Sequence, residues 1–309
     1  MSMRKSYFII LCLLLRVTLA HAGGSVAPAV SARFQDQVEA IAAGANTPAR
    51  ATAITQRLDA LGIEYRHDPF VSGNHRGTNI IAGLPGVGMP RLMLGAHYDR
   101  VAAGRGAVDN AAGAAVVLEL LAAFQAKPLK NYTVTAAFFD LEELGLLGSQ
   151  AYVAAQRRNL PAVFLNIDVF GYGNALWALA PKPASLTARA MRQAAAECKF
   201  PLEIGPIFPA SDHLSFAKTG VDTLALSLLE RREIERMKRY LNNQRPDETP
   251  RILTIIHSAH DTPDKVDRAA VLRALPVVEQ AIRLMDKERG AANERTRKSQ
   301  EKPATACGA

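Results

Sequence analysis

The chain has 309 residues, of which 49% are hydrophobic and 21% charged, and these values exclude a wholly disordered protein. Its formal net charge of +8 is concentrated at the ends, because residues 1–22 and 287–309 each carry +3 and the segment between them carries only +2. Nucleic-acid-binding proteins need a basic surface on their folded part, so this distribution argues against that class. No apolar run approaches the ~20 residues that span a bilayer, so no permanent transmembrane helix is expected.

The first 22 residues have the pattern of an export signal. Two basic residues precede the apolar run Phe8–Leu15, and small residues precede a cleavage point after Ala22. We therefore expect a mature chain from about Gly23 onward, located in a periplasm or outside the cell, without a stable membrane anchor. An uncleaved anchor is the alternative, but the run is short and Arg16 interrupts it.

Between residues 23 and 286, short apolar runs alternate with helical patterns. The predicted helices are Thr47–Leu61, Ala111–Gln125, Gly148–Gln156, Ser185–Lys199 and His213–Thr219. The predicted strands are rich in apolar or β-branched residues: Thr78–Gly83, Arg91–Ala96, Tyr132–Asp140, Ala162–Ile167, Thr223–Leu228 and Ile252–Ile256. Strands that alternate with helices predict a single α/β domain, with a mostly parallel mixed sheet covered by helices on both faces.

Two charged segments depart from this alternation. Residues 231–251 could form a solvated insertion or one wall of a substrate pocket, and we also expect loops near 173–185 and 205–212 to shape such a pocket. Residues 287–309 have almost no large apolar side chains, which predicts a basic, disordered tail.

Acidic and imidazole side chains follow several of the predicted strands. They are His97 and Asp99, Glu142 and Glu143, Asp168, and His257, and Asp109 joins them from the turn before a helix. In an open α/β sheet the carboxyl ends of the strands meet at the edge where ligands bind. A lone histidine after a strand is more often structural, and Asp109 could simply cap its helix. Their accumulation at one edge favours a functional site.

Imidazole and carboxylate ligands without thiolates suit catalytic zinc. This set exceeds what one ion needs, whereas two ions bridged by one carboxylate would use all of it. A water molecule between two such ions becomes a nucleophile near neutral pH. The sequence therefore predicts two zinc ions per chain.

Six stretches of the chain resemble the zinc-dependent exopeptidases of the M28 family, in the same order. They are GAHYDRV (95–101), GAVDNAAGAAVVLEL (106–120), FFDLEELGLLGSQAY (138–152), NIDVFGYG (166–173), SDHLSFAKTG (211–220) and IHSAHDTPD (256–264). The resemblance implies the zinc-exopeptidase fold and an aminopeptidase that hydrolyses the N-terminal peptide bond of peptide substrates. It also implies a cis peptide bond between Asp109 and Asn110.

The resemblance also implies a role for each site residue. His97 and Asp168 would hold one zinc ion, Glu143 and His257 the second, and Asp109 would bridge the two. Glu142 would be the general base, taking a proton from the bridging water and passing it to the leaving amine. Asp99 would fix the tautomer of the His97 imidazole.

Several alternatives stay open. His260 lies three residues after His257 and competes with it as the ligand. Single-zinc glutaminyl cyclases resemble these peptidases, although they depart from the Asp-Asn and Glu-Glu motifs that this chain keeps, and carboxypeptidases use the same two-metal centre. Relatives that have lost their ligands act as binding modules, but no ligand is missing here. Asp212 and Glu230 are candidates for holding the substrate α-amine.

Overall fold

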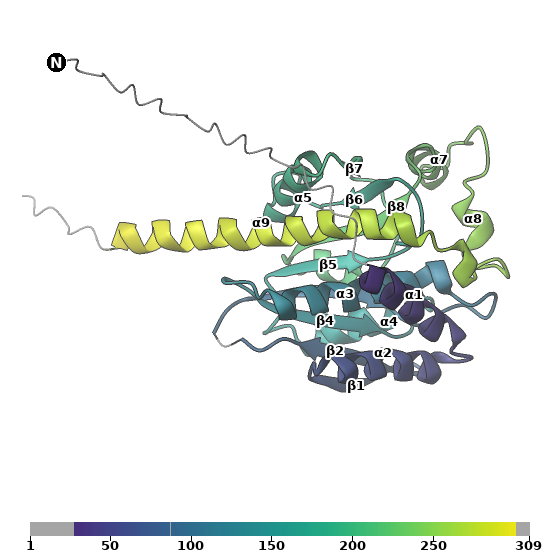
Figure 1. Ribbon diagram of the computed structural model, residues 1–309, viewed down its shortest axis with the longest axis horizontal. Coiled ribbons are helices and arrows are strands. Elements are labelled where there is room, and N and C mark those ends of the chain that lie inside the picture. The colour runs from purple at the N-terminus through teal and green to yellow at the C-terminus, as the bar shows by residue number, and fades with distance from the viewer. Residues whose placement is uncertain (1–27, 87, 301–309) are drawn as a thin grey trace, which may run out of the picture.

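A computed structural model describes residues 28–86 and 88–300, so the predicted export signal lies outside the described residues. The chain forms an eight-stranded sheet in the order β1-β2-β4-β3-β5-β8-β6-β7 (Figure 1). The strands are β1 (Tyr65–Ser72), β2 (His75–Gly83), β3 (Arg91–His97), β4 (Thr133–Phe139), β5 (Val163–Ile167), β6 (Ala175–Leu179), β7 (Leu202–Gly205) and β8 (Asp222–Leu229). The central strands β4, β3, β5 and β8 are parallel, while β1, β2 and β6 make the antiparallel pairings. The predicted mixed sheet is confirmed.

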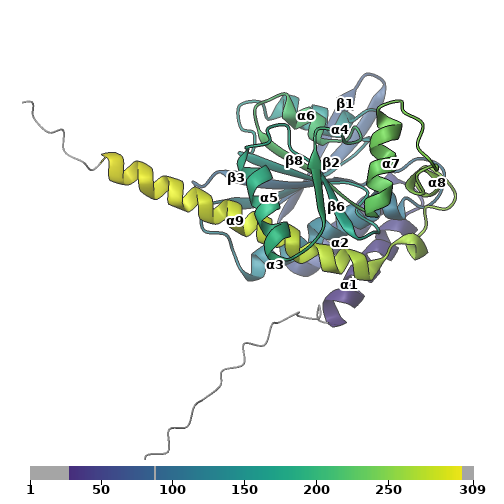
Figure 2. The same ribbon diagram turned by 90° about the horizontal axis from the view of Figure 1, so that it is seen from above.

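Helices cover both faces of this sheet, as predicted (Figure 2). They are α1 (Pro28–Ala43), α2 (Thr47–Leu61), η1 (Ala107–Ala111), α3 (Ala112–Ala126), α4 (Leu147–Ala155), α5 (Leu186–Glu197), α6 (His213–Ala217), α7 (Arg231–Leu241), α8 (Ile252–Ile255), η2 (Pro263–Lys265) and α9 (Arg268–Gln300). Helices α1, α2, α3, α5 and α9 pack on one face, and α4 and α6 on the other. Residues of β3 alternate accordingly, since Leu92 and Leu94 enter the larger core and Met93 the smaller one.

Two predictions for the body of the chain are wrong. The run Ile252–Ile256, predicted as a strand, contains the helical turn α8. A short apolar run does not distinguish a strand from a buried helix by pattern alone. The preceding strand β8 already pairs with β5 and β6 on its two sides, so it has no free edge with which this run could pair. Residues 175–179, expected within a loop, form strand β6.

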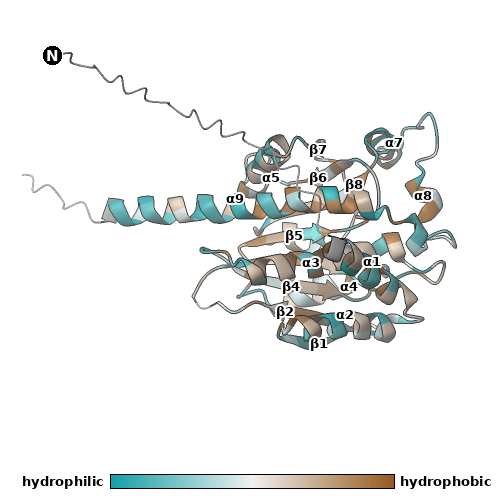
Figure 3. Cartoon of the chain, viewed as in Figure 1, coloured by the Kyte–Doolittle hydropathy of each residue, from teal (hydrophilic) through white to brown (hydrophobic). Residues whose placement is uncertain are grey.

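Helix α9 continues through residues 287–300, where the sequence predicts a disordered tail. This segment is rich in Ala, Arg, Lys and Glu, which favour helix even without an apolar face to bury. Figure 3 shows that the helix extends away from the body and is largely hydrophilic there. Residues 301–309 lie outside the described part of the chain.

One helical stretch, Ala107–Ala126, is long and apolar enough to cross a membrane by length and composition, which the sequence analysis did not expect. Most of it is buried inside the protein, as the helices of a protein core are. It covers the sheet directly behind the predicted site, because it begins at the turn that carries Asp109.

Candidate metal centre

Three neighbouring strands bring the predicted site residues to one edge of the sheet. His97 is the last residue of β3, Asp168 follows β5 directly, and Glu142 and Glu143 lie in the turn after β4. Because β4, β3 and β5 are adjacent and parallel, their carboxyl ends meet. Asp109 reaches the same place from η1. His257 also reaches it, although it follows the helical turn α8 rather than a strand.

The carboxylate of Asp109 lies between the two histidines. Its Oδ1 is 3.0 Å from His97 Nε2, and its Oδ2 is 3.1 Å from His257 Nε2. A second carboxylate accompanies each imidazole: Asp168 Oδ1 lies 3.4 Å from His97 Nε2, and Glu143 Oε2 lies 3.1 Å from His257 Nε2. The arrangement is therefore two half-sites, each with one histidine and one carboxylate, that share Asp109. The rival His260 is exposed and makes no ion pair with these carboxylates among the described residues.

Asp99 connects the two sides of this arrangement. Its Oδ1 lies 3.3 Å from His97 Nδ1, on the opposite side of the ring from Asp109. The same carboxylate accepts hydrogen bonds from the backbone N–H groups of Glu142 and Glu143, at 3.1 and 3.2 Å. One buried side chain thus orients the imidazole and holds the turn after β4.

Asp261 is a site residue whose contribution the sequence analysis missed. Its buried carboxylate accepts hydrogen bonds from the backbone N–H groups of Ala107, Val108 and Asp109, at 2.8, 2.7 and 3.2 Å. It therefore fixes the turn that presents the Asp109 carboxylate. The signal in the sequence was its place in the IHSAHDTPD stretch, which also carries His257.

The backbone before and after Asp109 is unusual. Gly106 has a φ of +56°, and a Cβ there would lie 2.7 Å from Arg100 Cβ and 2.8 Å from the Asp109 carbonyl oxygen, so only glycine fits. The peptide bond between Asp109 and Asn110 is cis, as the resemblance implies. The Asn110 side chain is fully buried and donates to the carbonyl of Ile167 at 2.9 Å, next to Asp168.

The site carries more negative charge than its side chains neutralise. Six carboxylates lie in or beside it, and among the described residues only His97 and His257 form ion pairs with them. They are Asp99, Asp109, Glu142, Glu143, Asp168 and Asp212. Burial raises the pKa of Glu142 to about 9 and that of Asp212 to about 7, and neighbouring carboxylates add to both increases. Burial alone would also raise the pKa of Asp109, but hydrogen bonds from His257 and His97 lower it well below its usual range.

These residues fit divalent metal ions. Ligand atoms of His97, Asp109 and Glu143 all lie within 4.8 Å of one another, close enough to hold an ion. Glu143 Oε1 and Asp168 Oδ1 are buried and accept no hydrogen bond, and buried acceptors are normally satisfied. Oxygen and nitrogen donors in this combination suit zinc.

The two candidates for holding the substrate α-amine differ in burial. Asp212 is fully buried and neither of its carboxylate oxygens has a hydrogen-bond partner, whereas Glu230 is exposed at the start of α7. His213 is buried against Phe208, with ring centroids 5.5 Å apart, and burial lowers its pKa to about 4.

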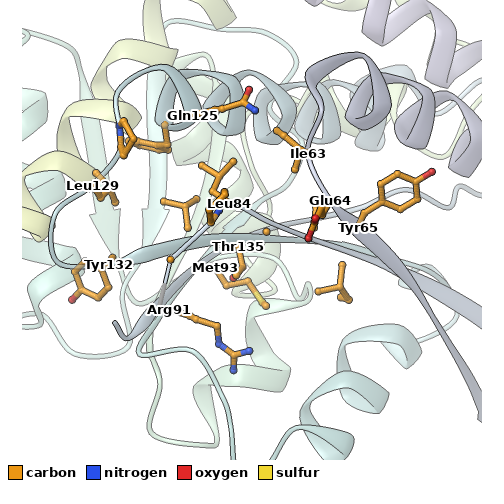
Figure 4. A pocket seen from close by; sticks show the side chains of 18 of the residues that line it. Ile63, Glu64, Tyr65, Leu84, Arg91, Met93, Gln125, Leu129, Tyr132 and Thr135 are labelled. Carbon is orange, nitrogen blue, oxygen red and sulfur yellow. The ribbon is translucent and has the colours of Figure 1, made fainter. Parts of the chain in front are cut away.

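A cavity of about 860 Å³ lies at the opposite edge of the sheet, where β3 and β4 begin, and none of the predicted site residues lines it (Figure 4).

Comparison with known proteins agrees with the motifs. Residues 79–282 match the model of peptidase family M28, and this range contains every predicted ligand. Leupeptin-inactivating enzyme 1 from Streptomyces exfoliatus is 39% identical over 128 residues, which cover 38% of this chain and 28% of that protein, so the match spans less than a third of the relative's length.

Solved structures give the same fold. BSAP, a zinc aminopeptidase from Bacillus subtilis, matches with a TM-score of 0.55 and 24% identity over 68% of this chain and 50% of that one. A glutaminyl cyclase from an Acidobacteriales bacterium matches with a TM-score of 0.66 and 20% identity over 88% of this chain and 99% of that one. Both likenesses concern the fold, whereas the family model covers most of the chain at the level of its residues. The chain belongs to peptidase family M28.

Proposed function

We propose that this protein is an exported two-zinc aminopeptidase that hydrolyses the N-terminal peptide bond of peptides. Membership of a peptidase family supports the reaction class. The export signal predicted in residues 1–22 supports a periplasmic or secreted location.

The position of Asp109 between His97 and His257 carries the proposal of two ions. One carboxylate oxygen faces each imidazole, at 3.0 and 3.1 Å. A single ion would leave one histidine and one carboxylate without a task, whereas two ions engage both half-sites. His97 and Asp168 would hold one zinc ion, Glu143 and His257 the other, and Asp109 both.

Zinc ions bound there would polarise the scissile carbonyl group and make a water molecule between them more acidic. Glu142 forms no ion pair with either histidine among the described residues, so its carboxylate is not engaged as a ligand and would be available to accept a proton. In this role Glu142 would take a proton from that water molecule and release it to the leaving amine. Asp99 would keep the His97 ring oriented throughout.

The sign of the charge favours the amino end of a substrate. No lysine or arginine among the described residues forms an ion pair with the carboxylates of the cluster. A protonated α-amine would be attracted to the carboxylates that stay charged there. No positively charged Lys or Arg side chain pairs with these carboxylates and could bind a substrate carboxylate instead, which argues against carboxypeptidase activity.

The test combines zinc content with hydrolysis of a panel of aminoacyl-arylamides. We expect two zinc ions per chain and arylamine release that a chelator stops. Peptides blocked at the amine should resist cleavage, while peptides blocked at the carboxyl end should be cut. The opposite preference would replace the aminopeptidase with a carboxypeptidase.

Glu142→Gln separates the base from the ligands. We expect turnover to fall by about 10²–10⁴-fold, because general-base catalysis contributes roughly that factor, while both zinc ions stay bound. Zinc content is measured by elemental analysis beside the rate. Glu39→Gln, which changes an exposed acid on α1 outside the cluster, serves as the control and should keep full activity. Loss of zinc from Glu142→Gln would show that Glu142 is a ligand.

A single-zinc glutaminyl cyclase is the second candidate. The observation that favours it is the glutaminyl cyclase structure, of which 99% is covered by this chain. In that case the protein would hold one zinc ion, leave arylamides intact and release ammonia from peptides with N-terminal glutamine.

A further inference from the structure

Arg50, on α2, is fully buried and forms no ion pair with a carboxylate among the described residues. Its guanidinium instead donates to backbone carbonyl oxygens. Nε donates to Tyr98 at 2.5 Å, Nη1 to Arg105 at 2.9 Å and more weakly to Ile41 at 3.4 Å, and Nη2 to Gly106 at 3.1 Å. Burial lowers the pKa of Arg50 to about 10, so the side chain stays charged at neutral pH. A buried charge is costly unless its hydrogen bonds are satisfied, and here carbonyls satisfy them.

The carbonyls belong to the two segments that present the candidate ligands. Tyr98 lies between His97 and Asp99, and Arg105 and Gly106 directly precede the turn that carries Asp109. The guanidinium thus joins the end of β3 to the turn before α3. Arg50 binds the carbonyl groups that precede this turn, whereas Asp261 binds its N–H groups. The Asp261 carboxylate accepts hydrogen bonds from the three backbone N–H groups that follow Gly106.

Side chains of the site segments also donate hydrogen bonds back to the hairpin of α1 and α2. Arg105 Nε donates to the carbonyl of Ala42 at 3.2 Å, and Arg100 Nη2 donates to the carbonyl of Ala45 at 3.1 Å. These carbonyls lie at the end of α1 and in the turn before α2, where helix carbonyls lack partners within the helix. Gly44 allows the close approach, since a Cβ there would lie 2.6 Å from Arg50 Cγ.

We propose that Arg50 is a positioning residue of the metal centre. Through Arg50, the helical hairpin formed by α1 and α2 helps to hold the metal-binding residues in place. Arg50 fixes the backbone on which His97 and Asp109 stand, so the two half-sites keep their spacing before an ion binds. The hairpin precedes residue 79, where the match to the family model begins, so this support comes from outside the matched segment. The inference rests on the proposed function, because it takes the cluster to be a zinc site.

Arg33 offers a matched control. It lies on α1 and also ties the hairpin to the core, through Glu119 of α3, with Nε 2.7 Å from Oε1. Replacing Arg33 removes an anchor of the same hairpin without touching the turn at 105–109. Arg50→Met and Arg33→Met are therefore compared for zinc affinity by chelator competition, for amide hydrogen exchange of residues 105–109 in the metal-free protein, and for kcat and KM.

We expect Arg50→Met to bind zinc about 10–100-fold more weakly than the wild type, as other changes behind metal ligands do. Its kcat should fall more than its KM changes, and the amides of residues 105–109 should exchange faster without metal. Arg33→Met should keep the zinc affinity of the wild type within about twofold, even if it melts at a lower temperature. Equal zinc affinity in the two folded variants would overturn the proposal.

Arg50→Lys guards against failure of Arg50→Met to fold. Lysine keeps the charge but lacks the planar fork that reaches several carbonyls at once, so its zinc affinity should still fall below that of the wild type. Wild-type affinity and kcat in Arg50→Lys would contradict the proposal. A wild-type protein that binds no zinc would refute the proposed function itself, whereas two ions bound with wild-type affinity in every Arg50 variant would refute only this inference.

Discussion

The two half-sites of the candidate metal centre are built differently. On one side, the His97 side chain is 1% exposed, ends a central strand and has Asp99 behind its ring. On the other, the His257 side chain is 54% exposed and stands on a residue with a φ of +56°, just after the short helix α8. The first half is fixed by the sheet before any ion arrives, whereas the second is held mainly by its contacts with Asp109 and Glu143. We therefore expect the His97 side to bind zinc more tightly.

Asp109→Ala should have the largest effect, because it removes the carboxylate common to both half-sites. We expect zinc content to fall from two ions to none and arylamide hydrolysis to fall to the level of the chelated enzyme. Elemental analysis after gel filtration measures the first, and a rate assay the second. Asp264→Ala, an exposed acid in η2, should change neither quantity. Two retained ions in Asp109→Ala would reduce Asp109 to a helix cap.

Replacing each histidine separately tests whether the His97 half-site binds zinc more tightly than the His257 half-site. His257→Ala should keep one tightly bound zinc ion and a stable fold, because its half-site is exposed and peripheral. His97→Ala should hold at most one ion, and a weak chelator should remove it, because the buried half-site is lost. His260→Ala is the matched control for His257 and should behave as the wild type. If His257→Ala loses more zinc than His97→Ala, the ranking of the half-sites is wrong.

Asp99→Asn should have the smallest effect of the three. The amide keeps the size of the side chain but loses the negative charge that faces His97 Nδ1 and the backbone N–H groups of Glu142 and Glu143. We expect zinc affinity or kcat/KM to fall by about 10–100-fold, with two ions bound at saturating zinc. Chelator competition and a kinetic titration measure both quantities. Wild-type values would mean that Asp99 does not orient the imidazole.

The buried half of the site could be predicted from the sequence because a local rule places it. Runs such as RLMLGA and AVFLNI form buried parallel strands, and residues that follow such strands meet at one edge. His97, Glu142 and Asp168 come together for this reason, and the same rule brings Glu143 of the other half-site to this edge.

The exposed half shows where that rule ends. His257 lies at the site as predicted, but the reason for the prediction was wrong, because the run before it forms a helix and not a strand. β-branched residues favour strands only where a neighbouring strand is available, and pairing partners are set by the whole fold. The contacts of Arg50 and Asp261 were not predictable for a related reason, since each joins its side chain to a turn that lies at least 48 residues away in the sequence.

The most direct test of the two-zinc account is a zinc titration of the metal-free protein, monitored by calorimetry. We predict saturation at two ions per chain in two resolved steps, the first tighter, with loss of only the weaker step in His257→Ala. Saturation at one ion per chain, unchanged by His257→Ala, would contradict the shared role of Asp109 and the two-zinc mechanism with it.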